Sequence, residues 1–114
     1  MTFALTGKDY YPSTAYGRLT ATSGGLLGSV INVADLGQSP QDGFTEYLGY
    51  PGATSPRWGD YNWAIYYAGR VYFAGEYIPY RSCTGSAFTL TIGTCGGTRD
   101  GYANWGTSVN SVWP

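Results

Sequence analysis

Residues 61–78 read YNWAIYYAGRVYFAGEYI, and this stretch decides the fold class of the chain. Two apolar, aromatic-rich runs, 61–67 and 70–78, are separated only by Ala68-Gly69. Large apolar side chains recur at every second position, which places them on one face of an extended strand. A short, glycine-bearing connection between two such runs is typical of a tight turn. The sequence therefore predicts a β-hairpin here.

Outward from this hairpin the same strand-like pattern recurs, and helical periodicity is poor throughout. Six strands are predicted, at residues 1–6, 14–22, 28–34, 61–67, 70–78 and 104–113. Ser23 to Leu27 is a second short connection, whereas 7–13, 35–60 and 79–103 are longer. In an up-and-down arrangement the three longer connections emerge on one face, where connecting segments commonly carry function. The expected fold class is all-β.

Composition limits the classes of function. The chain has 114 residues, which suits one small domain or a piece of a larger one, and its net charge is −1. Six scattered cations cannot form a phosphate-binding patch, so nucleic-acid binding is not expected. No apolar run approaches the roughly 20 residues of a membrane span, so no membrane partner is expected. Histidine is absent, which removes the commonest general base and metal ligand. No cofactor or metal is expected.

The two cysteines, Cys83 and Cys95, both lie in the connection 79–103, which is rich in Gly, Thr and Ser. We interpret them as a disulfide, in preference to two free thiols. Such a bond would stabilise the chain by about 3 kcal/mol through the loop that it closes. A disulfide requires an oxidising compartment, so secretion is expected.

Five short motifs follow one another along the chain. They are Asp9-Tyr10-Tyr11-Pro12-Ser13, Gln41-Asp42-Gly43-Phe44, Arg57-Trp58-Gly59-Asp60-Tyr61, Glu76-Tyr77-Ile78-Pro79 and Ala103-Asn104-Trp105-Gly106-Thr107. Together they resemble the C-terminal portion of secreted, sialidase-like β-propeller proteins of the BNR-repeat type. The resemblance covers nearly the whole chain.

The resemblance implies a single propeller segment over 1–114, with six strands in about two incomplete four-stranded blades, each an antiparallel meander. Residues 1–34 form the end of one blade, 35–60 a long loop, and 61–114 the next blade, which includes the disulfide-bearing loop 79–103. One strand is missing from each blade, so strand edges are left open. The expected partners are the remaining blades, supplied by another chain or by identical copies.

The loop-rich face is expected to bind glycan, because it gathers polar and aromatic side chains. The candidate ligand-binding residues are Asp9, Tyr10, Tyr11, Arg57, Trp58, Asp60 and Glu76. Structural roles are open for several of them. Asp60 can cap a turn by accepting backbone N–H bonds, and the tryptophan and tyrosine rings can serve in packing.

No catalytic residue is assigned, and the expectation leans away from an enzyme. The Asp-box repeat of sialidases, Ser-x-Asp-x-Gly-x-x-Trp, does not occur. Two alternatives stay open beside the structural role. In one the segment contributes to the active site of a sialidase-like glycoside hydrolase; Asp9, Asp42 and Asp60, expected on the same face, could also provide the paired carboxylates of a generic glycosidase. In the other it is a glycan-binding lectin module.

Overall fold

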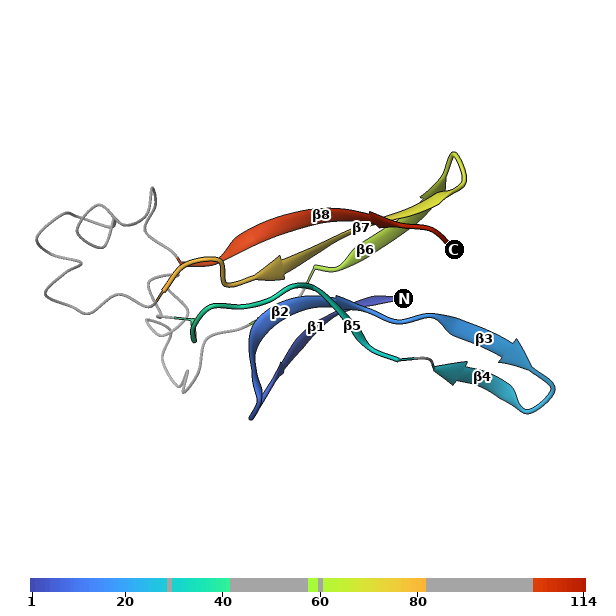
Figure 1. Cartoon of the computed structure of the whole chain (residues 1–114), viewed down its shortest axis with the longest axis horizontal. Helices are drawn as coiled ribbons and strands as arrows, with labels where there is room; N and C mark the ends of the chain where they lie inside the picture. Colours follow the sequence, from blue (N-terminus) through green and yellow to red (C-terminus); the bar gives the residue numbers. More distant parts are fainter. Residues whose placement is uncertain (29, 42–57, 60, 82–103) are drawn as a thin grey trace, which may run out of the picture.

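The structure is a computed structural model, and it describes residues 1–28, 30–41, 58–59, 61–81 and 104–114. These ranges hold eight strands and no helix. Six of the strands form two three-stranded sheets, and the remaining two form a separate hairpin (Figure 1). All pairs are antiparallel. The predicted all-β class is confirmed.

The second sheet contains the hairpin that the sequence predicts. Its strands are β6 (Trp63–Tyr67), β7 (Arg70–Tyr77) and β8 (Gly106–Val112), in that order across the sheet. Ala68 and Gly69 both have positive φ, 48° and 82°, as a two-residue turn of the favoured hairpin type requires. The pairing runs from Tyr67 opposite Arg70 up to Trp63 opposite Ala74. The predicted β-hairpin is confirmed.

The first sheet corrects one predicted connection. Its order is β1 (Thr2–Gly7), β2 (Tyr10–Tyr16) and β5 (Asn32–Asp35). A long loop over 7–13 is wrong, since only Lys8 and Asp9 form the turn and β2 starts at Tyr10. Proline is tolerated inside this strand because the β1–β2 register shifts beside it, and strands accept proline at bulges.

The separate hairpin consists of β3 (Leu19–Thr22) and β4 (Gly25–Gly28). Single strands over 14–22 and 28–34 are therefore wrong, because each predicted strand spans parts of two. A backbone pair between Met1 and Gly17 ends the first sheet, with the Gly17 N–H donating to the Met1 carbonyl at 2.9 Å. Beyond this pair the chain leaves the sheet, and the hairpin projects away from the two sheets (Figure 1).

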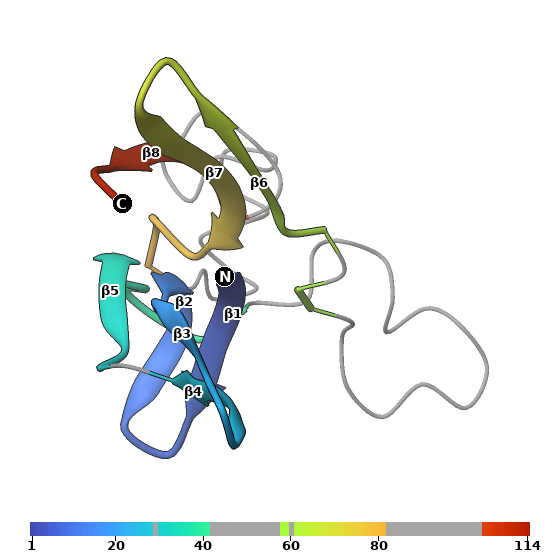
Figure 2. The ribbon, with the colours of Figure 1, turned by 90° about the vertical axis from the view of Figure 1, so that its right-hand side faces the viewer.

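The two three-stranded sheets lie face to face, as the view along the molecule shows (Figure 2). Across their interface, β7 contacts both β2 and β1. The Thr14 hydroxyl donates to the Glu76 carbonyl at 3.1 Å, and the Ser108 hydroxyl donates to Thr14 Oγ1 at 3.2 Å. At one side of the interface, Asn110 Nδ2 donates to Asp35 Oδ2 at 2.6 Å. The stacking of the sheets is thus fixed in large part by hydrogen bonds.

Few apolar side chains are buried. Among the residues that the structure describes, the buried hydrophobic ones are Ala15, Phe73 and Ile78. Phe73 lies against Tyr16, with ring centroids 5.2 Å apart. Ile78 links the sheets through its backbone: its N–H donates to the Pro12 carbonyl and its own carbonyl accepts from the Gln38 N–H. The core is therefore a thin layer between β2 and β7.

Candidate functional site

A β-bulge directs two neighbouring tyrosines to one place. Leu5 is opposite Ser13 and Gly7 is opposite Tyr10, so β2 has one residue more than β1 between these two pairs. Neighbours in a regular strand point to opposite faces, but a bulge re-aims the side chains around it. As a result Tyr10 and Tyr11 both line the same groove, with 44% and 49% of each residue exposed.

The backbone beneath these tyrosines is held from two sides. The buried Ser13 hydroxyl donates to the Tyr11 carbonyl at 2.6 Å and accepts from the Gly37 N–H at 2.9 Å. From the other sheet, the Ile78 N–H donates to the Pro12 carbonyl at 3.0 Å. Position 37 has no room for a side chain, because a Cβ there would overlap the Pro12 carbonyl oxygen. The backbone that carries the two tyrosines is therefore held in place, and we call it the platform of the tyrosine pair.

The groove has a volume of about 480 Å³, within the range of small-ligand sites. It lies between the end of the β1–β2 hairpin and segments from the connection between β5 and β6. None of the described residues that line it carries a charge, and several offer a hydroxyl or amide beside an aromatic or proline ring. The lining residues are Thr6, Gly7, Tyr10, Tyr11, Pro12, Pro40, Gln41 and Trp58. We call this feature the tyrosine groove.

Trp58 is placed in the groove wall by the turn that follows it. Gly59 has a positive φ of 75°, and a Cβ there would lie 2.7 Å from that of Ala4, so this turn needs glycine. Asn62 Nδ2 donates to the Gly59 carbonyl at 3.2 Å and closes the turn. The indole Nε1 of Trp58 is buried and has no hydrogen-bond partner. The indole ring of Trp58 thus forms part of the groove wall, while its N–H group makes no hydrogen bond.

Three of the seven candidate residues therefore come together: Tyr10, Tyr11 and Trp58. Asp9 lies in the exposed β1–β2 turn, where it pairs with Lys8 at 3.8 Å, and it does not line the groove. Glu76 is the residue before the last one of β7 and is half-buried. Its carbonyl, rather than its carboxylate, accepts the bond from Thr14. Neither carboxylate joins the tyrosine groove.

Several sequence-based predictions fall on parts of the chain outside the described residues. They concern the ligand-binding candidates Arg57 and Asp60, the carboxylate Asp42 and the disulfide between Cys83 and Cys95. These stay predictions.

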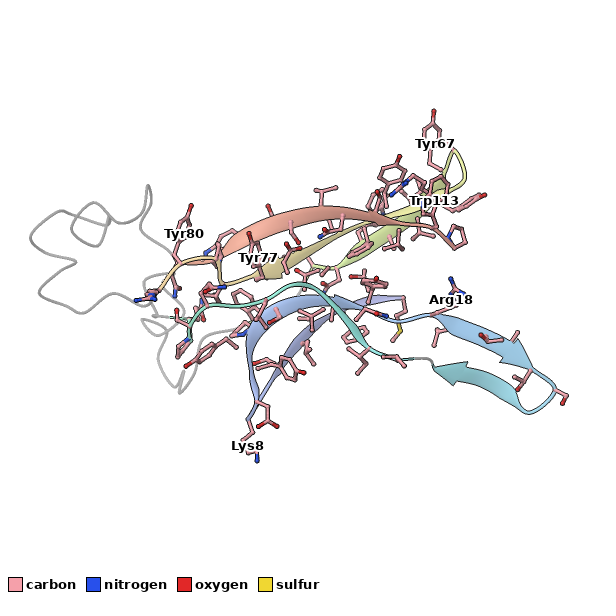
Figure 3. All side chains as sticks on the ribbon, viewed as in Figure 1. Lys8, Arg18, Tyr67, Tyr77, Tyr80 and Trp113 are labelled. Carbon is pink, nitrogen blue, oxygen red and sulfur yellow. The ribbon has the colours of Figure 1, made fainter. Side chains whose placement is uncertain are left out.

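Two buried polar residues, Asn104 and Ser39, were not predicted from the sequence as site-forming groups. Asn104 is fully buried, and its Nδ2 donates to the Pro40 carbonyl at 2.8 Å, to Ser39 Oγ at 3.3 Å and to the Tyr80 carbonyl at 3.4 Å. The Ser39 hydroxyl also donates to the Tyr80 carbonyl, at 2.8 Å. Three segments distant in sequence meet here, at the end of the molecule marked by Tyr80 (Figure 3). Asn104 lies in a motif that the sequence singled out, but nothing in the motif indicates which backbone it binds.

One finding about the described residues concerns metal ligands. They contain no cluster of three or more His, Cys, Asp and Glu side chains that could hold a metal ion. Within the same part of the chain there is no helix long and apolar enough to cross a membrane. Comparison of the chain with family models, with curated proteins and with solved structures found no match. The assignment of function therefore depends on the geometry.

Proposed function

We propose that the chain is a structural and binding segment of an extracellular, sialidase-like β-propeller, completed by strands from elsewhere. The missing strands come from the remaining blades of another chain or from identical copies. One observation supports this most strongly: the outer face of the sheet β6–β7–β8, which we call the aromatic face, exposes Trp63, Ile65 and Val109 to solvent. A face of this kind is a typical binding surface for another protein layer.

The face follows from the register of the second sheet. Phe73 and Gly75 point toward the first sheet, because they meet Tyr16 and Thr14 there. The alternate row, in which Trp63, Ala74 and Val109 lie side by side, therefore points outward. Of these residues, 59% of Trp63 and 78% of Val109 are exposed. The row is apolar, and burial against a further sheet would stabilise it.

Open edges support the same proposal. Across the two sheets the outer strands are β1 and β5, and β6 and β8, and each pairs on one side only within the described residues. Unpaired edges are templates for additional strands. Between the sheets, a gap of about 730 Å³ opens at the end opposite Tyr80, near both chain ends (Figure 3). Its lining is mainly apolar and includes Val71, Phe73, Val112 and Trp113.

The motifs that resemble sialidase-like propellers add to this support. Two successive three-stranded meanders that stack face to face are what two incomplete blades require. Secretion enters the proposal through the same resemblance and through the predicted disulfide.

A surface variant tests the proposal. Val109→Lys places a charge in the outward row of the second sheet, on its outer strand β8, without touching the interface between the two sheets. We expect self-association to fall in light scattering, together with the fluorescence of a bound apolar dye. Ser23→Lys, at the tip of the projecting hairpin, is the matched control and leaves both readouts unchanged. Equal behaviour of the two variants would contradict the proposal.

A further inference from the structure

The geometry points to a binding site for an uncharged carbohydrate in the tyrosine groove. We propose that a neutral sugar ring of a polysaccharide stacks on Tyr10 and Tyr11, with Trp58 as a third wall. This inference goes beyond the proposed assembly and does not depend on it. The groove lies on the first sheet, whereas the aromatic face proposed for assembly belongs to the second.

The lining matches the chemistry of a sugar. A pyranose has apolar C–H faces and a rim of uncharged hydroxyls, so its site needs flat rings surrounded by neutral donors and acceptors. Tyr10 and Tyr11 supply both features, because a tyrosine combines an apolar ring with a polar tip. The Thr6 hydroxyl and the Gln41 amide add neutral hydrogen-bonding groups to the lining. The lining residues that the structure describes are all uncharged, which suits a neutral ligand.

The platform is organised before any ligand arrives. Ser13 Oγ and the Ile78 N–H bind the carbonyls of Tyr11 and Pro12, and Gly37 packs directly against the same backbone. A ligand that stacks on the rings therefore orders little backbone on binding, which favours affinity. The bulge is needed as well, because a regular strand would direct the two rings to opposite faces.

A proline-rich peptide is the competing occupant, since such peptides also dock in aromatic-lined grooves. The sugar is favoured because hydroxyl or amide groups accompany the rings around the lining, whereas docking of a proline-rich segment relies mainly on the rings. The test below separates the two occupants.

Affinity electrophoresis of the full chain in gels containing galactomannan, xylan or a soluble β-glucan tests the inference. We expect retardation by at least one of these neutral polysaccharides. In Tyr10→Ala/Tyr11→Ala the affinity falls about tenfold or more, because both stacking surfaces are gone. Tyr67→Ala removes an exposed tyrosine at the opposite end of the molecule and leaves retardation unchanged (Figure 3).

A second variant keeps the test decisive if the double alanine variant does not fold, as judged by circular dichroism. Tyr10→Phe/Tyr11→Phe preserves both rings and removes only the hydroxyls, so we expect measurable but weaker retardation. Three results would overturn the inference. They are no retardation by any of the three polysaccharides, retardation that the groove variants leave intact, and binding of a polyproline peptide in place of the sugars.

Discussion

Gly75 is a residue at which the two sheets approach each other closely. A Cβ at this position would lie 2.6 Å from Thr14 Cγ2, 2.8 Å from Thr14 Oγ1 and 3.0 Å from Asn62 Oδ1. The glycine is needed for space and not for its backbone angles, since it has no positive φ. From the sequence alone it reads as an ordinary interruption of a strand.

Gly75→Ala is expected to destabilise the chain by about 1–3 kcal/mol, because the added methyl group forces β7 away from β2. Urea unfolding followed by tryptophan fluorescence measures the loss. Gly7→Ala, in a strand where a Cβ would meet nothing within 4 Å, serves as the control and changes stability by less than about 0.5 kcal/mol. Similar losses in both variants would show that the sheets do not meet at Gly75.

A second prediction at the scale of single residues concerns Trp58. Its indole N–H is buried without an acceptor, and such a group costs about 1–3 kcal/mol. Trp58→Phe removes the unpaired donor and keeps an aromatic ring, so we expect the gain to offset most of the lost packing. The free energy of unfolding should stay within about 1 kcal/mol of the wild type in urea titrations. A loss well above this value would mean that the N–H is bound in solution.

At the scale of elements, the β6–β7 hairpin was predictable because its signals are local. The alternation of aromatic residues and the two-residue connection both lie within one window of sequence. The turn nevertheless holds a strained residue, since Ala68 has a φ of 48°. Residues other than glycine rarely adopt a positive φ.

Ala68→Gly should therefore stabilise the hairpin, by about 1 kcal/mol, since glycine adopts a positive φ without steric cost. Thermal unfolding provides the measurement. In Ala74→Gly, within β7, the same exchange of residues removes β-structure propensity at a regular position and should destabilise the chain. Stabilisation by both substitutions, or by neither, would contradict the assignment of this turn.

Asn104 connects the elements at the other end of the molecule. Asn104→Ala should cost about 2 kcal/mol, because the bonds to Ser39, Pro40 and Tyr80 are lost from a buried position. Asn32→Ala is the control, since the Asn32 amide is exposed and donates only locally, to the Val30 carbonyl. Chemical denaturation of both variants tests the difference, and equal losses would speak against a role for Asn104 in joining the three segments.

Other elements could not be predicted, and the reasons are physical. Tyr10-Tyr11-Pro12 looks like part of a loop because proline opposes regular pairing, yet the bulge in β2 accommodates it. Residues 14–22 are rich in strand-forming residues on both sides of Gly17, but the long-range pair of Met1 with Gly17 ends the sheet at that point. Both outcomes depend on partners far away in the sequence. The tyrosine groove could be anticipated only as a set of aromatic residues, because the bulge that gathers them is a property of the pairing.

At the scale of the whole molecule, the resemblance to a propeller segment predicts two successive groups of three strands. The structure has two three-stranded antiparallel sheets and, between β2 and β5 in the chain, an additional two-stranded hairpin. The sequence pattern does not indicate what covers the aromatic face of the second sheet. The described residues bury three hydrophobic side chains, while many large ones, including Trp63 and Val109, are mainly exposed. For so small a core, association is the expected way to bury the remaining apolar surface.

The most direct test is the molar mass of the full chain in solution, measured by sedimentation equilibrium over a wide range of concentrations. We predict a mass that rises with concentration, or a closed oligomer of defined size, and in either case less association for Val109→Lys. A single monomeric species at every concentration, with cooperative unfolding and no binding of an apolar dye, would contradict the need for outside β-structure.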